Sequence, residues 1–139
     1  MARILVIDDD QAVRLTIQLV LERAGHEVTL ADSGRQGVQL FGDDDFDLLI
    51  VDIFMPGMDG LETMRDIHRL RPAVPVVVIS GYAFRTPVET VPDFLKMATK
   101  LGAVASLQKP FGPGALLAAV DGCLRAALPE RSDVSSGQR

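Results

Sequence analysis

Several features that mark whole classes of protein are scarce in this sequence. It contains a single cysteine, Cys123, which cannot form a disulfide within the chain and lies among apolar residues of a predicted helix, so we expect a buried thiol. The net charge is −5 and no basic cluster is present, which argues against direct binding to nucleic acid. No apolar run approaches the roughly 18 residues of a membrane span, and MARILVID at the start leaves no room for a signal peptide before a predicted strand. These shortages predict a cytoplasmic protein that binds no membrane.

The length and composition are those of one globular domain. With 139 residues, 47% of them hydrophobic and 24% charged, the chain can bury a real core but is too short for two ordinary domains. We expect the domain to occupy residues 2–128. The stretch that follows, PERSDVSSGQR, begins with proline and is polar, so a disordered tail is predicted at 129–139.

Short apolar runs alternate with helical patterns along the chain. Strands are predicted at 3–7, 27–31, 48–51, 76–79 and 104–107. Helices are predicted between and after them, at about 11–24, 34–41, 61–70, 93–101 and 113–128. Five repetitions of strand and helix predict an α/β protein with a doubly wound parallel sheet, right-handed crossovers and helices on both faces.

One stretch, LLIVDIFMPGMDG at 48–60, indicates a functional site. Its four apolar residues fit a strand buried on both faces, and that strand ends at one carboxylate, Asp52. Proline and glycine then break regular structure, so the carboxylate stays accessible at the carboxyl edge of the sheet, where ligand sites of such sheets lie. Asp8, Asp9, Ser80 and Lys109 also follow predicted strand ends. We therefore expect all five side chains to converge at this edge.

At these residues the sequence resembles a response regulator receiver domain of two-component signalling, similar to the chemotaxis regulators. The matching motifs are the acidic pair Asp8-Asp9, the acceptor in VDIFMPGMDG, the hydroxyl residue in VVVISGYA and the lysine in LQKPF. Each motif is weak alone, but all four occur in order, each at the end of a predicted strand. The resemblance covers residues 2–128 and implies a flavodoxin-like, three-layer (βα)5 sandwich with strand order 2-1-3-4-5.

The resemblance also implies a chemistry for these residues. Asp52 would accept a phosphoryl group from the phosphohistidine of a sensor histidine kinase or a histidine phosphotransfer protein. Asp9, Asp52 and the backbone carbonyl of Phe54 would bind Mg²⁺, and Asp8 would act partly through water. Lys109 would neutralise charge that develops on the transferred group. The protein would then not be an enzyme, apart from the self-catalysed phosphorylation and dephosphorylation of Asp52.

A phosphorylation switch follows from the same resemblance. The added phosphoryl oxygens would draw in Ser80, through its hydroxyl, and Lys109. The face formed by the fourth helix, fifth strand and fifth helix would change in response, and an unknown output protein would read it. The resemblance further implies a cis peptide bond before Pro110, which proline permits at low cost.

Three features depart from the family pattern. Ser106 stands at the switch position where receivers carry Tyr or Phe, so relay through the rotation of an aromatic ring is in question. Ser80 and Lys109 are 29 positions apart (109 − 80), about seven more than is usual in the family, which predicts an enlarged loop at 81–93. Phe54 and Tyr82 would flank the path of the attacking water, and their bulk predicts slow self-dephosphorylation.

Two other functions stay open at this point. A phosphatase of the haloacid dehalogenase type also uses an Asp after its first strand with Mg²⁺ and a lysine, and Asp8 and Asp10 have the required spacing. However, Ala12 stands where Thr or Val is usual, and no cap domain is present. The second alternative is a binding scaffold that no longer cycles, which Ser106 and the enlarged loop would suit. Multiple turnover would indicate the phosphatase, and one phosphoryl group on Asp52 would exclude the scaffold.

The remaining polar residues have simpler interpretations. Asp10 is predicted to cap the first helix rather than to bind metal. Asp43, Asp44 and Asp45 are predicted to form a solvated turn. His68, within HRLRP, falls late in a capped helix and is interpreted as an exposed surface histidine.

Overall fold

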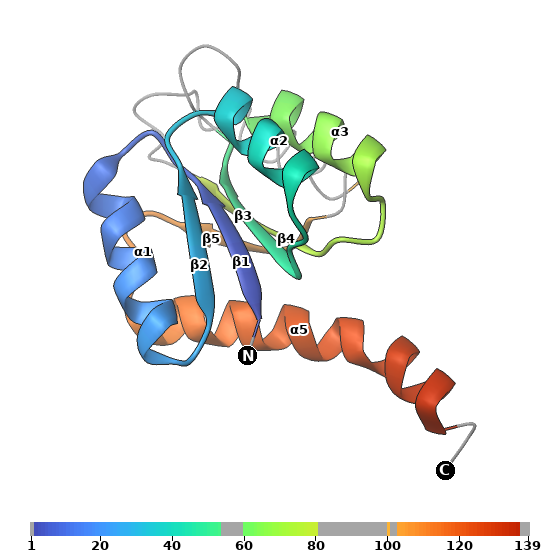
Figure 1. The fold of residues 1–139 in the computed structure, drawn as a ribbon. Coiled ribbons are helices and arrows are strands. Elements are labelled where there is room, and N and C mark those ends of the chain that lie inside the picture. Colours follow the sequence, from blue (N-terminus) through green and yellow to red (C-terminus); the bar gives the residue numbers. More distant parts are fainter. Residues whose placement is uncertain (1, 54–59, 81–99, 101–102, 137–139) are drawn as a thin grey trace.

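A computed structural model describes residues 2–53, 60–80, 100 and 103–136, with side chains described up to residue 125. Its centre is one sheet of five parallel strands in the order β2-β1-β3-β4-β5 (Figure 1). The strands are β1 (Arg3–Ile7), β2 (Glu27–Ala31), β3 (Leu48–Asp52), β4 (Val76–Ser80) and β5 (Ala103–Gln108). The predicted α/β class, the parallel sheet and the strand order are thereby confirmed.

Helices cover both faces of this sheet. They are α1 (Gln11–Arg23), α2 (Gly34–Asp43), α3 (Gly60–Leu70) and α5 (Pro113–Ser136). Helices α2 and α3 pack on one face, while α1 and α5 pack on the other (Figure 1). Successive residues of a strand point to opposite faces, so Leu5 of β1 joins the first core and Ile4 joins the second. Strands β3 and β4 are buried at every position, as expected for inner parallel strands between two helical layers.

In the second half of the chain, one predicted segment lies mostly outside the described residues and one helix is longer than predicted. The predicted helix at 93–101 and the loop at 81–93 lie outside the described residues, except for Lys100, which is helical. Helix α5 continues to Ser136, where the sequence predicted an end near Leu128 and a disordered tail. Proline removes a helical hydrogen bond and crowds the preceding turn, which favours the end of a helix before Pro129. The backbone does not follow this tendency, and the last turns of α5 project past the sheet (Figure 1).

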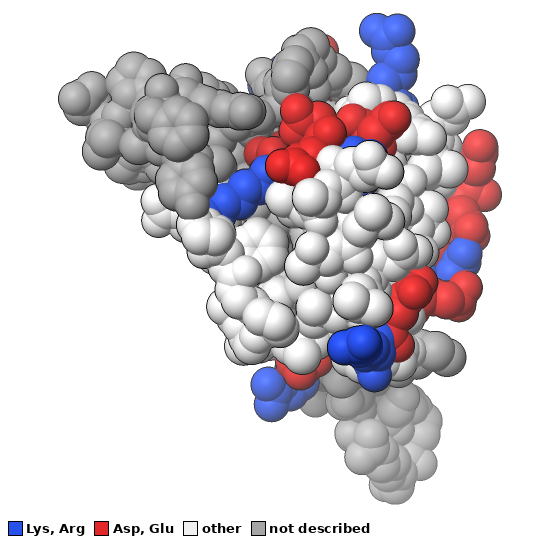
Figure 2. Space-filling view, turned by 90° about the vertical axis from the view of Figure 1, so that its left-hand side faces the viewer, with Lys and Arg blue, Asp and Glu red and all other residues white. Residues whose placement is uncertain are grey.

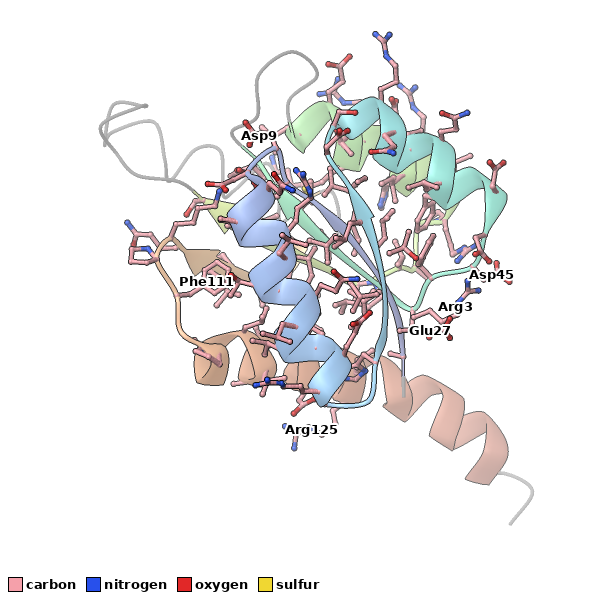
Figure 3. All side chains as sticks on the ribbon, turned by 60° about the vertical axis from the view of Figure 1, so that its left-hand side comes forward. Arg3, Asp9, Glu27, Asp45, Phe111 and Arg125 are labelled. Carbon is pink, nitrogen blue, oxygen red and sulfur yellow. The ribbon has the colours of Figure 1, made fainter. Side chains whose placement is uncertain are left out.

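The acidic stretch at 43–45 is exposed to solvent, as predicted, but it also ends α2 and forms ion pairs that the sequence did not indicate. Asp43 is the last residue of α2, Asp44 bonds to the guanidinium of Arg3, and Asp45 lies 2.8 Å from Arg71. Both arginines also lie over aromatic rings that stack on each other, Arg3 over Phe46 and Arg71 over Phe41. These contacts close the amino end of the sheet, where Figure 3 shows Arg3 and Asp45 together and away from Asp9.

Other local predictions hold. Asp10 is the N-cap of α1, and its carboxylate accepts hydrogen bonds from the backbone N–H groups of Ala12 and Val13. The thiol of Cys123 is free and buried, and this burial raises its pKa. Within the part of the chain that is described, no helix is both long and apolar enough to cross a membrane.

Candidate functional site

The ends of the inner strands deliver the predicted site residues to one edge of the sheet. Asp52 is the last residue of β3, where it pairs with Ile79 of β4, and Ser80 follows as the last residue of that strand. Asp8 follows β1 directly, and its N–H donates to the carbonyl of Ala31 in the neighbouring strand. Asp8, Asp52 and Ser80 are 0%, 2% and 5% exposed, so their polar groups must find partners inside the protein.

Lys109 connects these strand ends. Its Nζ lies 3.0 Å from Oδ2 of Asp52 and 3.1 Å from Oδ2 of Asp8. Its backbone N–H donates to the carbonyl of Ser80 at 2.9 Å. The residue that follows β5 therefore links β1, β3 and β4 at their carboxyl ends, and the ammonium lies between the two buried carboxylates.

Asp8 is held at almost every polar atom. Its side-chain Oδ1 accepts the N–H of Asp10 at 2.9 Å, and its backbone carbonyl accepts a hydrogen bond from Nη1 of Arg14 at 2.6 Å. The other carboxylate oxygen, Oδ2, is buried and accepts no hydrogen bond from any residue described, although the Lys109 ammonium is nearby. Since buried carboxylate oxygens are normally satisfied, Oδ2 is suited to a further cationic or donor ligand. Arg14 could not be identified from the sequence, because no motif connects it to Asp8.

Three carboxylates form a group that could hold a cation. One oxygen from each of Asp8, Asp9 and Asp52 lies within 4.8 Å of the other two, with Asp9 exposed at the rim. Oxygen ligands lie about 2.1 Å from Mg²⁺, so two ligands on opposite sides of the ion are about 4.2 Å apart. The carboxylate oxygens lie within 4.8 Å of one another, so a carboxylate that is too far from the ion to bind directly would bind it through water. Three carboxylates and the Lys109 ammonium leave two negative charges, which a divalent cation would balance. The residues therefore fit Mg²⁺.

The electrostatics of the site agree with this assignment. The pKa of Asp8 is raised from 3.8 to about 6, mainly by burial and also by the charge of Asp52, against the lowering effects of the Asp10 hydrogen bond and Lys109. Burial acts to lower the pKa of Lys109, but the charges of Asp52 and Asp8 and the hydrogen bonds to them outweigh it, so this pKa is raised. The lysine is therefore protonated at neutral pH, and its charge offsets part of the negative charge of the carboxylates.

The site is open to the surface. Figure 2 shows acidic side chains gathered at one end of the molecule, with a basic side chain next to them and a broad uncharged surface below. A pocket of about 310 Å³ adjoins Lys109 on the side of α1. It is lined by Lys109, Pro110 and Phe111, by the capping Asp10, and by Ala12, Val13, Thr16 and Ile17 of α1. The pocket therefore adjoins the site at Lys109, and none of the three carboxylates lines it.

The other predicted residues are placed as follows. The Lys109–Pro110 peptide bond is cis, as the resemblance implied. Ser106 lies on β5 with its side chain exposed, paired with Val78 of β4. Phe54, with its carbonyl, and Tyr82 lie outside the described residues. The structure thus brings together Asp8, Asp9, Asp52 and Lys109, with Ser80 at the adjoining strand end.

Comparison with known proteins agrees with the fold. The model of the response regulator receiver domain matches residues 4–121. The transcriptional regulatory protein ZraR of Escherichia coli K12 is 39% identical over 107 residues, which are 77% of this chain and 23% of ZraR. FixJ of Bradyrhizobium diazoefficiens is 33% identical over 126 residues, which are 91% of this chain and 58% of FixJ. A CheY-like receiver domain protein from Methanospirillum hungatei JF-1 superposes with a TM-score of 0.83 at 30% identity, covering 94% of this chain and 98% of that one.

The chain belongs to the response regulator receiver domain family. It therefore represents a module of two-component signalling, and the haloacid dehalogenase alternative has no support from the family match. The chain spans about a quarter of ZraR and a little over half of FixJ, so the activities of those whole proteins are not transferred to it.

Proposed function

We propose that this protein is a phosphoacceptor switch that takes a phosphoryl group from a phosphohistidine donor onto Asp52 with the help of Mg²⁺. The observation that carries this proposal is the position of Asp52. It ends the central strand, its Oδ2 lies 3.0 Å from Lys109, and its carboxylate shares a cluster with Asp8 and Asp9. A buried carboxylate with one ammonium partner and a place for a divalent cation has the surroundings that phosphoryl transfer needs.

The chain's own residues have distinct roles in the proposed transfer. A carboxylate oxygen of Asp52 forms the new P–O bond while the P–N bond of the donor breaks, and the electron pair returns to the imidazole nitrogen. Lys109 places positive charge beside the transferred group, and Ser80 offers its hydroxyl to a phosphoryl oxygen. Mg²⁺, held by Asp9, Asp52 and the carbonyl of Phe54, with Asp8 partly through water, would supply further positive charge to the phosphoryl oxygens.

The proposed partners follow from the family. The donor is a sensor histidine kinase or a histidine phosphotransfer protein, which would approach the acidic end of the molecule seen in Figure 2. The output protein reads the face that includes β5 and α5, and the phosphoryl group alters this face by drawing in Ser80 and Lys109. Exposed Ser106 in place of an aromatic residue would make this relay different from the usual one. We place the domain at 2–128 and in the cytoplasm, with slow loss of phosphate owing to Phe54 and Tyr82.

The experiment that tests this function is intact mass spectrometry after incubation with acetyl phosphate and Mg²⁺. We expect the wild-type chain to gain the mass of one phosphoryl group, and Asp52→Asn to gain none. Asp121→Asn removes an exposed carboxylate of α5 and should react like the wild type. Addition of a chelator should suppress the reaction because the remaining negative charges would repel the phosphodonor.

The outcomes separate the competing functions. No added mass on the wild-type chain, under conditions in which a known receiver reacts, would contradict the proposal and favour a non-cycling scaffold. An added group that persists in Asp52→Asn would show that another residue is the acceptor. Release of many equivalents of inorganic phosphate per chain from small phosphate esters would instead indicate a phosphatase.

A further inference from the structure

Arg14 makes a contact that the proposed chemistry does not use. It lies in the second turn of α1, and its Nη1 donates to the backbone carbonyl of Asp8 at 2.6 Å. The acceptor belongs to the residue that leads from β1 into the acidic cluster, so the guanidinium reaches the main chain directly behind a carboxylate of the proposed cation site. A hydrogen bond from a charged donor to a carbonyl in a buried residue is worth more than an ordinary one.

The helix gives Arg14 a fixed base. Its N–H bonds to the carbonyl of Asp10 at 3.0 Å, as part of the regular helix. One turn further on, Ile17 and then Leu21 are fully buried in the core between α1 and the sheet. Arg14 therefore ties the backbone of Asp8 to an element that packing holds in place.

The bond from Arg14 completes a set of bonds that hold Asp8. Its N–H is bonded to Ala31 and its Oδ1 to the N–H of Asp10, so the Arg14 bond fixes the peptide that follows Asp8. That peptide carries Asp9, the exposed member of the acidic cluster. Rotation of this peptide would move the carboxylate of Asp9 relative to that of Asp52, and metal-binding oxygens must be held to within about 0.5 Å for tight binding.

We infer that Arg14 is a positioning residue for the cation site, holding the loop between β1 and α1 so that Asp8 and Asp9 face Asp52. This inference rests on the proposed function, because it takes the cluster to be a Mg²⁺ site. Arg14 acts through a backbone hydrogen bond and touches neither the cation nor the phosphoryl group. Loss of a group that orients metal ligands typically costs 10-fold to 100-fold in metal affinity.

The sign of the effect distinguishes positioning from simple charge. If Arg14 acted only through its positive charge, its removal would relieve repulsion and Mg²⁺ would bind more tightly. If it positions the loop, its removal must weaken Mg²⁺ binding although the site has become more negative. The two roles therefore predict changes in opposite directions.

The test measures Mg²⁺ affinity on the full chain without any phosphodonor. Thermal unfolding midpoints are recorded over a Mg²⁺ titration, which gives the dissociation constant from the stabilisation at each concentration, and calorimetric titration provides a second value. We expect Arg14→Met to bind Mg²⁺ about 10-fold more weakly than the wild type. Arg35→Met removes an exposed arginine from α2 and should stay within twofold of the wild type.

The results can contradict the inference cleanly. Affinity of Arg14→Met that is unchanged within twofold, or increased, would overturn it, even if the variant unfolds at a lower temperature. Should Arg14→Met not fold, Arg14→Gln is a polar alternative that removes the guanidinium and is too short to keep its bond to the Asp8 carbonyl, and affinity within twofold of the wild type would overturn the inference equally. Failure of the wild-type chain to bind Mg²⁺ at all would instead count against the proposed function.

Discussion

Asp8 combines complete burial with a negative charge, and this makes it the least favourable ionised group of the site. The carboxylate is 0% exposed, and burial and Asp52 raise its pKa to about 6 against the opposing effect of Lys109. In the unfolded chain the same group has its ordinary pKa of 3.8. Between these two values the folded protein binds more protons than the unfolded chain, so the free energy of unfolding must fall as the pH rises.

We therefore predict a specific pH dependence in the presence of a chelator. One pKa unit corresponds to about 1.4 kcal/mol, so Asp8 should lower the free energy of unfolding by about 2–3 kcal/mol as the pH rises from 4 to 7. Below the unfolded pKa this cost is absent, and above the folded pKa it is fully present. Urea denaturation at several pH values measures it.

The control for this prediction is Asp8→Asn, which cannot ionise at this position. Other groups titrate in both proteins, so the difference in unfolding free energy between wild type and variant isolates Asp8. The free energy of unfolding of the variant should therefore increase relative to that of the wild type from pH 4 to pH 7. A difference independent of pH would show that the charge of Asp8 is compensated in the folded state.

At the scale of secondary structure elements, Gly60 determines how closely α3 approaches the strand that ends in Asp52. It is the first residue of α3, and a Cβ at this position would overlap the carbonyl oxygen of Asp52 and the Cα of Ile53. Both obstructing atoms belong to the backbone, so they cannot move aside as a side chain could. Any larger residue must therefore push α3 away from β3.

We predict that Gly60→Ala lowers the free energy of unfolding by about 1–3 kcal/mol, as overpacking of a core does, and slows phosphorylation of Asp52. Urea denaturation and the mass assay measure the two effects. Gly122→Ala is the matched control, since a Cβ there meets nothing within 4 Å and alanine favours the helix by about 0.5–1 kcal/mol. Stability of Gly60→Ala equal to that of the wild type would show that α3 can shift without cost.

The elements themselves could be predicted from the sequence to within a few residues. Buried parallel strands are short, apolar and bounded by polar or turn residues, so β1 can be predicted with its observed limits and β3 with one residue fewer. The convergence of Asp52 and Lys109 followed from topology alone. The ion pairs of Asp44 and Asp45 could not be foreseen, because Arg3 and Arg71 lie 41 and 26 positions away and no local pattern links them. The same holds for Arg14, whose contact depends on the direction of one side chain.

In the molecule as a whole, the two ends of the sheet carry different kinds of side chains. Arginine pairs and stacked rings close the amino end, whereas the carboxyl end carries the charged site (Figure 3). Among the residues whose side chains are described, α5 contributes Leu116, Val120 and Cys123 to the buried core, and its partly buried Leu117, Ala119 and Leu124 pack against that core. All of these residues precede the last turns of the helix.

We predict that a chain shortened after Leu128 folds and accepts phosphate like the full chain. The free energy of unfolding should change by less than about 0.5 kcal/mol, as for changes away from the core. Urea denaturation and the mass assay check this on both lengths. A drop of several kcal/mol would show that the end of α5 packs against the domain and that the domain limit lies beyond 128.

The count of charges around Lys109 has a further consequence for the two states of a switch. With a divalent ion bound, three carboxylates and one ammonium are electroneutral. Replacing the single negative charge of Asp52 by the near-double charge of an acyl phosphate leaves a surplus of about one negative charge. No single arrangement of this pocket is balanced in both states, so the surrounding chain must recruit dipoles or cations when phosphate arrives and release them when it leaves.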